Sequence, residues 1–272
     1  MYVQYFKPLE PGHHFPIVFI HGGGNSGQYF IATPGGRKGW APYLVEKGWP
    51  VYVVDWPGHG RSFHIADDSY RLMDIRSVVT DIGELLKRTG PVILVTHSIG
   101  GMIGWKVAEQ NNGLVAAVVG IAPGPPANLL PPLPVTSPQF VPEDTTLYFD
   151  RSYAQEYWTT TPLFPQQAFE DFFKSLQPES PRLVNERNNV LGMGLYVSGP
   201  NALGGIPVLV QIGDFDPRHS IASDKPIADF FNGDFIYLPN VGLSGHGHFQ
   251  MSEYGNLDVA DVFLRWLAKK GF

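Results

Sequence analysis

The chain has 272 residues, of which 43% are hydrophobic and 16% are charged, and its formal net charge is −6. A chain of this length can bury a sizeable core, and α/β folds of this size often form one unit, so we expect a single domain over residues 1–272. The acidic balance argues against nucleic acid as a partner, because phosphate binding needs a basic surface. The lack of cysteine excludes disulfides, thiol catalysis and thiolate metal sites.

The N-terminal residues 1–8 lack the charged-then-apolar pattern of a signal peptide. They predict a cytoplasmic location, although a chain trimmed of its leader would look the same. No apolar run approaches the length of about 18 residues that a membrane span needs. We therefore expect no membrane span, and no feature of the sequence predicts an oligomeric state.

The first apolar run, residues 17–20, predicts a buried strand that leads directly into His21-Gly22-Gly23-Gly24. Glycines in this place allow positive φ angles and let backbone N–H groups face a ligand. In serine hydrolases such a loop donates one N–H of the oxyanion hole, and the residue after the nucleophile donates the other. We assign these donors to Gly23 and Ile99, with Gly24 as the alternative for the first. A flexible glycine loop is the other interpretation; a phosphate loop is disfavoured because no Lys-Ser/Thr pair follows.

The next elements alternate between strand and helix patterns. Near-continuous apolar runs predict strands over residues 51–55, 92–97 and 114–121, and helical spacing predicts helices over 40–47 and 77–88. Buried strands that alternate with helices indicate a mostly parallel sheet with helices on both faces.

The segment Thr96-His97-Ser98-Ile99-Gly100 joins the predicted strand at 92–97 to an amphipathic run, residues 102–110. A serine between a strand and a helix, with small neighbours two residues away, is typical of a nucleophile elbow. Gly100 supplies one small neighbour, whereas Thr96 stands where glycine is commonest. The alternative is an ordinary serine N-cap.

The regular pattern breaks at residues 125–205, which are rich in proline at first and in aromatic residues afterwards. We expect this segment to be a lid, because it follows the carboxyl end of a strand, where α/β sheets place their ligands. A helical excursion packed on the core is the other interpretation. The aromatic candidates for an apolar acyl or alcohol pocket are Tyr148, Phe149, Tyr153, Tyr157, Trp158, Phe164, Phe169, Phe172 and Phe173.

The sheet pattern resumes with strands at 206–212 and 235–238, each followed by residues that complete a catalytic triad. A serine hydroxyl needs a base that is oriented by a carboxylate, and in this type of fold the chain order is serine, acid, histidine. Ser98, Asp216 and His248 have that order.

Asp214 and His246 remain as alternatives for the acid and the base. We prefer Asp216 because it fits the pattern Gly-x-x-Asp, whereas Asp214 would cap the turn. His246 and His248 as a metal pair are disfavoured because no third ligand is nearby, so no metal is expected.

Taken together, these motifs resemble the α/β-hydrolase superfamily. Several stretches are similar to a small group of bacterial serine esterases that use a Ser-His-Glu triad: residues 33–40, 96–98, 122–124, 206–210 and 238–248 with the sequence that follows. The run Thr-Pro-x-Gly-Arg-x-Gly-Trp is the most specific element. In that group the glutamate follows the strand after the elbow, a place where this chain has Ala122. The resemblance therefore implies the fold, the nucleophile and the base, but not the acid.

The resemblance and the motifs together imply an α/β-hydrolase fold with a lid before the acid-bearing strand. The expected activity is serine-dependent cleavage of a small carboxylic ester through an acyl-enzyme intermediate, without a cofactor. The aromatic segment predicts a mostly apolar, uncharged substrate. A lactonase or a hydrolase of carbon–carbon bonds would use the same triad, and a non-catalytic small-molecule binding protein is the alternative outside the enzymes.

Overall fold

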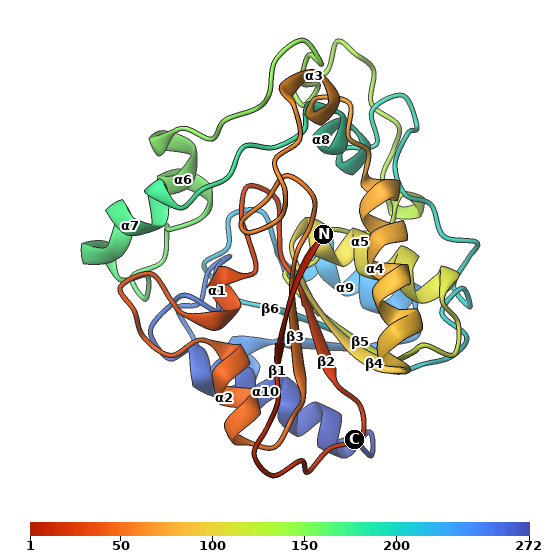
Figure 1. Ribbon diagram of the computed structural model, residues 1–272. Helices are drawn as coiled ribbons and strands as arrows, with labels where there is room; N and C mark the ends of the chain where they lie inside the picture. The colour runs from red at the N-terminus through yellow and green to blue at the C-terminus, as the bar shows by residue number, and fades with distance from the viewer.

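One seven-stranded sheet forms the centre of the computed structural model, which describes residues 1–272 (Figure 1). The strand order is β1-β3-β2-β4-β5-β6-β7, in which β1 runs antiparallel to β3 and every other pair is parallel. The strands are β1 (Tyr2–Phe6), β2 (Ile17–Ile20), β3 (Val51–Asp55), β4 (Val92–His97), β5 (Val115–Ile121), β6 (Val208–Ile212) and β7 (Asp234–Tyr237). The predicted α/β class with a mostly parallel sheet is confirmed, and the antiparallel edge strand β1 is an addition to the prediction.

Helices cover both faces of this sheet (Figure 1). Helices α4 (Ile75–Thr89), α5 (Ile99–Gln110) and α9 (Ile221–Phe230) pack on one face. Helices α1 (Gln28–Ile31), α2 (Trp40–Glu46) and α10 (Asn256–Lys269) pack on the other. No helix of the protein combines the length and the apolar character that crossing a membrane requires.

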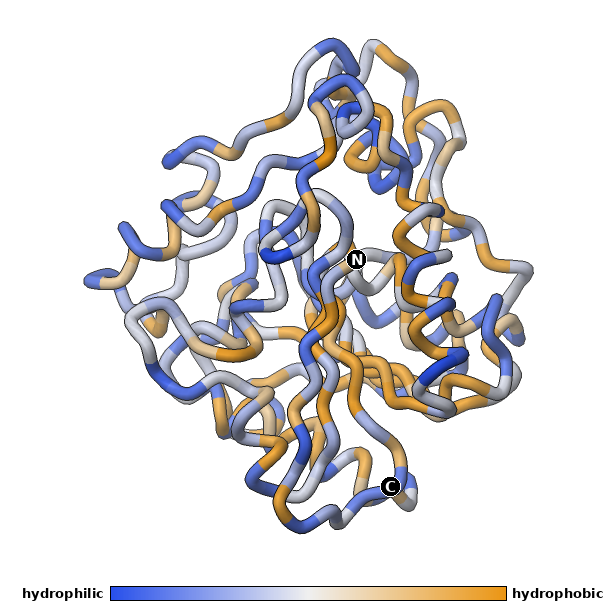
Figure 2. The backbone as a smooth tube through the Cα atoms, viewed as in Figure 1, coloured by the Kyte–Doolittle hydropathy of each residue, from blue (hydrophilic) through white to orange (hydrophobic).

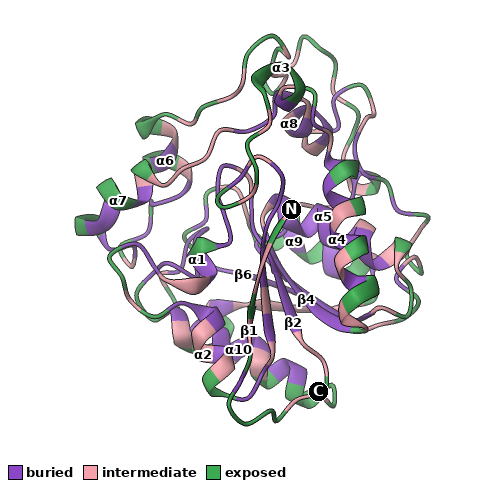
Figure 3. Ribbon diagram, in the orientation of Figure 1, coloured by how far each residue is buried: buried purple, intermediate pink, exposed green.

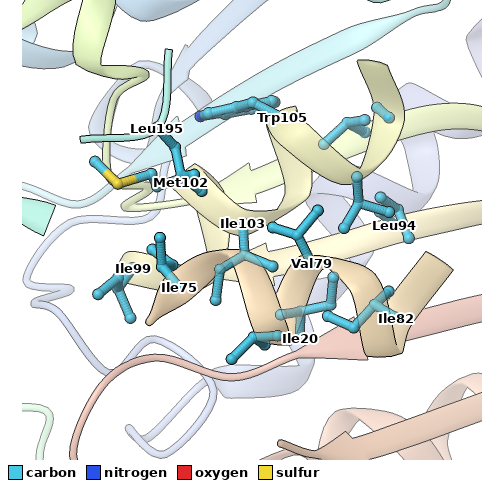
Figure 4. Packing of buried hydrophobic residues seen from close by; sticks show 14 of the residues in the cluster. Ile20, Ile75, Val79, Ile82, Leu94, Ile99, Met102, Ile103, Trp105 and Leu195 are labelled. Atoms are coloured by element: carbon cyan, nitrogen blue, oxygen red, sulfur yellow. The ribbon is translucent and has the colours of Figure 1, made fainter. Parts of the chain in front are cut away.

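The strands are apolar throughout because each contributes side chains to two cores. Along β2, Val18 and Ile20 belong to the core under α4 and α5, whereas Ile17 and Phe19 belong to the core under α2 and α10. The hydrophobic colour concentrates in the central strands in Figure 2, and the same strands are buried in Figure 3. Figure 4 shows the first core at close range, where Ile103 of α5 packs between the side chains of α4 and the sheet.

Helix α4 shows how the sequence determines an element's ends. The carboxylate of Asp74 accepts a hydrogen bond from the Ser77 amide at 2.8 Å and so caps the first turn. Gly90, with φ of 77°, ends the helix in a conformation that disfavours other residues. The helix therefore begins two residues before the predicted 77–88 segment, because the cap lies at position 74.

The segment 125–205 connects β5 to β6; its helices lie at the left and top of Figure 1, and the stretch after them runs down the right side. It contains three short α-helices, α6 (Arg151–Tyr157), α7 (Phe169–Lys174) and α8 (Pro181–Arg187). Its side chains share a cavity with Ser98, at the carboxyl end of β4. The segment therefore covers the end of the sheet where the serine lies.

Candidate active site

Ser98 lies in a strained turn between β4 and α5. Its φ and ψ are 55° and −126°, which is a rare backbone conformation for a residue with a side chain. A Cβ atom at position 100 would lie 2.5 Å from the His21 carbonyl oxygen, so only glycine fits there. Thr96 is accommodated on the other side because Gly104 of α5 faces it; a Cβ at position 104 would lie 2.6 Å from the Thr96 methyl carbon. A threonine therefore stands at position 96, where glycine is commonest in such turns, and Gly104 leaves room for its side chain.

The substitution Gly100→Ala is expected to destabilise the protein by about 1–3 kcal/mol, because a methyl group would collide with backbone oxygens that cannot move aside. Urea unfolding followed by circular dichroism would measure the change in the free energy of unfolding. Gly12→Ala is the matched control, since a Cβ at position 12 meets nothing within 4 Å. Equal midpoints for both variants would contradict the tight packing of the turn.

His248 and Asp216 form a buried pair near this serine. The Nδ1 atom of His248 lies 2.6 Å from Oδ2 of Asp216, and both side chains are almost completely buried. The His248 carbonyl contacts Nε2 of His97 at 3.0 Å, which holds the histidine loop against the residue before Ser98. Of the candidates for base and acid, these two are the residues that the structure brings together.

The two alternatives have other partners. Nδ1 of His246 lies 2.8 Å from the Glu253 carboxylate, a pairing that the sequence did not reveal. The carboxylate of Asp214 accepts a hydrogen bond from the Gly245 amide at 2.7 Å. Asp214 therefore fixes the loop that precedes the histidines, as expected of a residue that caps a turn.

Burial lowers the pKa of His248 to about 3; the charge of Arg218 acts in the same direction, and Asp216 opposes it. Burial by itself would raise the pKa of Asp216, but the charge of His248 and the hydrogen bond to it hold that pKa below its ordinary value. At neutral pH the imidazole is therefore neutral beside an ionised carboxylate. This is the state in which Nδ1 donates its proton to Asp216 and Nε2 has a free lone pair.

His219, which sequence reasoning missed, lies against His248 with the ring centroids 5.3 Å apart. Asp216, His219 and His248 bring one potential metal ligand each to within 4.8 Å of one another. The Nδ1 atoms of both histidines contact carboxylates, since that of His219 lies 2.7 Å from Asp224. The cation of Arg218 acts on both Asp216 and His248, which makes the cluster a poor place for a divalent metal.

The glycine loop after β2 and the first turn of α5 each contribute one free backbone donor. The Gly24 amide donates to the Glu179 carboxylate at 3.0 Å and is therefore occupied. The amide of Gly23 has no acceptor in the protein, and that of Ile99 lies in the first turn of α5, where no helical acceptor exists. Gly23, Ser98 and Ile99 line the same cavity. Of the two candidates in the loop, Gly23 has the available N–H.

Glu179 is a second buried group that the sequence did not single out. It is 1% exposed, and its Oε2 atom also lies 3.3 Å from Nε2 of His59. His59 is itself buried and contacts the Pro57 carbonyl, so it is a structural histidine. Glu179 therefore ties the segment 125–205 to the glycine loop.

The main cavity that contains Ser98 has a volume of about 710 Å³, and several aromatic side chains line it. Five of the nine aromatic candidates line it: Tyr148, Phe149, Tyr153, Tyr157 and Trp158. Three others, Phe164, Phe169 and Phe172, are buried in the core, where Phe172 packs edge-on against Phe249. The expected place of these three in the pocket is wrong, because α7 turns Phe169 and Phe172 toward the core, and Phe164, which precedes the helix, packs against Phe172. Phe173 is partly buried and stacks on Phe169 outside the cavity. Four charged residues also line the cavity: Asp150, Glu179, Arg187 and Arg218.

Comparison with known proteins adds an independent observation. Residues 16–218 match a family model described as the alpha/beta hydrolase fold. A protein named "Probable secreted lipase phiG" from Fungal sp. (strain ATCC 74256) is 24% identical over 99% of this chain and 86% of its own length.

Among solved structures, a novel bacterial esterase superposes with a TM-score of 0.63 at 20% identity, covering 98% of this chain and 84% of its own. The methylesterase MES16 from Arabidopsis superposes with a TM-score of 0.71 at 16% identity, covering 94% of this chain and 99% of its own. At these identities the structural likeness concerns the fold.

Proposed function

The chain belongs to the α/β-hydrolase family, and from this premise we propose that it is a carboxylesterase-type serine hydrolase. The observation that carries the proposal is the buried pair of His248 and Asp216 beside the strained turn of Ser98. The similarity to a lipase and to esterases supports a carboxylic ester as the substrate.

In the proposed mechanism, Ser98 attacks the ester carbonyl while Nε2 of His248 takes the hydroxyl proton. Asp216 holds Nδ1–H in place and stabilises the imidazolium that forms. The N–H groups of Gly23 and Ile99 bind the oxyanion of the tetrahedral intermediate. The imidazolium then protonates the departing alcohol, which leaves an acyl-enzyme. Water, deprotonated by His248, releases the acid and regenerates Ser98. No step in this sequence uses a cofactor.

We propose further that residues 125–205 act as a lid over this site. Two contacts connect the segment to the glycine loop, which holds one of the proposed oxyanion donors: the Glu179 carboxylate with the Gly24 amide, and the Gly24 carbonyl with the Gln177 amide at 2.9 Å. Its aromatic side chains Phe149 and Trp158 line the cavity and favour an apolar portion of the substrate.

The proposal is tested with nitrophenyl esters of graded acyl length, together with labelling by a fluorophosphonate. We expect turnover with a length optimum that reflects the cavity of about 710 Å³, and a stoichiometric phosphonate adduct on the peptide that contains Ser98. Native protein without any adduct would contradict the proposal and favour a binding protein. An adduct without ester turnover would retain the nucleophile but indicate another substrate, such as a lactone.

A further inference from the structure

Two arginines lie where the two cavities that contain Ser98 meet. Arg187, at the end of α8, and Arg218, just after Asp216, line the main cavity. Both also line a second cavity of about 290 Å³. Ser98 and Ile99 likewise line both cavities. The arginines are thus positioned beside the reacting serine, whichever cavity a substrate enters.

Neither guanidinium forms an ion pair with a carboxylate, although the charge of Glu179 acts on Arg187 and that of Asp216 on Arg218. Nη1 of Arg187 donates only to the side-chain oxygen of Asn188, at 3.2 Å, and Nη1 of Arg218 lies 3.5 Å from the Tyr153 hydroxyl. The Nε and Nη2 atoms of Arg218 are buried and donate to no group. Burial and the nearby charge of Arg218 lower the pKa of Arg187, which means that two like charges repel each other here. Buried charged donors without an acceptor are rare and unfavourable in folded proteins.

The carboxylates that line the main cavity are engaged elsewhere. Asp150 caps helix α6 by accepting the Tyr153 amide at 2.7 Å. Glu179 accepts the amides of Gly24 and Ser180 and contacts His59. Neither forms an ion pair with Arg187 or Arg218, and the second cavity has no carboxylate in its lining. The junction is therefore a cationic place in a protein whose net charge is −6.

We propose that Arg187 and Arg218 bind a carboxylate group of the substrate beside Ser98. The preferred substrates are then half-esters of dicarboxylic acids or esters of hydroxy acids, with an apolar portion against the aromatic wall. The planar guanidinium matches a carboxylate with two parallel hydrogen bonds, and such charge-assisted bonds are among the strong ones. This inference rests on the proposed ester hydrolysis, and it replaces the expectation of an uncharged substrate.

The test compares esters whose carboxylate is free with controls in which a methyl group removes that negative charge. Mono(para-nitrophenyl) adipate places the carboxylate on the acyl side, and its methyl ester is the neutral control. Meta-butyryloxybenzoate places the carboxylate on the alcohol side, and methyl meta-butyryloxybenzoate is its control. We expect kcat/KM for at least one anionic ester to exceed that of its control by about tenfold or more, mainly through a lower KM.

Variants of the arginines connect this preference to the residues. Arg187→Gln and Arg218→Gln are each expected to reduce the ratio of anionic to neutral kcat/KM by about tenfold. Arg187→Lys should retain part of the ratio, because lysine keeps the charge but lacks the planar guanidinium that donates two parallel hydrogen bonds. The matched control is Arg265→Gln, which removes a charge from the exposed side of α10 and should leave the ratio unchanged.

Two results would contradict the binding of a carboxylate by Arg187 and Arg218. A ratio near one for both ester pairs in the wild type would overturn the inference. So would variants that slow the anionic and the neutral esters equally, since that result would indicate a role in folding or in the chemistry. A failure of the proposed function would give a different result. If Ser98 were not the nucleophile, the Ser98→Ala variant would still hydrolyse the neutral esters.

Discussion

The substitution Ser98→Ala is expected to lower kcat for a nitrophenyl ester by about 10⁶-fold, which is the loss seen when the nucleophile of a serine hydrolase triad is removed. Alanine retains the backbone geometry of the turn as closely as any substitution can, since it removes a single oxygen from a residue with φ of 55°. The residual rate would come from the oxyanion donors alone. KM should change little if the ester binds mainly through the cavity walls.

Steady-state kinetics on both proteins, purified in parallel, measure this loss. Ser69→Ala is the matched control, because Ser69 is exposed on the short helix α3 (Asp67–Tyr70), away from the cavities that contain Ser98. Its kcat should equal that of the wild type. A kcat for Ser98→Ala within tenfold of the wild type would show that another group performs the chemistry.

The second large effect is expected for Asp216→Asn, which should lower kcat by about 10⁴-fold with the fold intact. The carboxylate of Asp216 accepts the Nδ1 proton of His248 at 2.6 Å. An amide can present its NH₂ group at the same place, which would move the ring proton to Nε2 and remove the lone pair that takes the serine proton in the proposed mechanism. The loss should appear in kcat, whereas urea unfolding should show that the protein remains folded.

Asp214→Asn is the matched control for this prediction. Asp214 lies two residues away and is only partly buried, and its carboxylate holds the Gly245 amide rather than a histidine. We expect less than about a tenfold loss, since an amide oxygen can accept the same hydrogen bond. If Asp214→Asn lost the larger part of the activity and Asp216→Asn did not, the assignment of the acid would be reversed.

The sequence predicted the sheet well because buried parallel strands are apolar on both faces. Strands β2 and β3 coincide with their predicted segments. It missed β1, which lies at the edge of the sheet with Tyr2 and Tyr5 exposed. Such a strand lacks an apolar run, because its stability comes from pairing with β3 rather than from a core of its own.

The local geometry of the site could also be predicted in part. A serine between a strand and a helix, and a glycine at position 100 where a Cβ would meet backbone oxygens, are properties of neighbouring residues. The chain order of Ser98, Asp216 and His248 matches the order of serine, acid and histidine in this type of fold. Each follows a predicted strand, and the carboxyl ends of parallel strands meet at one edge of the sheet.

The fold class, the turn that carries Ser98 and a short choice of partners for it could thus be predicted from the residues alone. Tertiary structure decided which partners meet. His246 and His248 are two residues apart, yet one contacts Glu253 and the other Asp216, because the path of one loop sends their side chains to different carboxylates. It also brought Arg187 and Arg218 together at the serine from separate elements. Contacts of this kind depend on how distant segments pack, and no local pattern of residues encodes them.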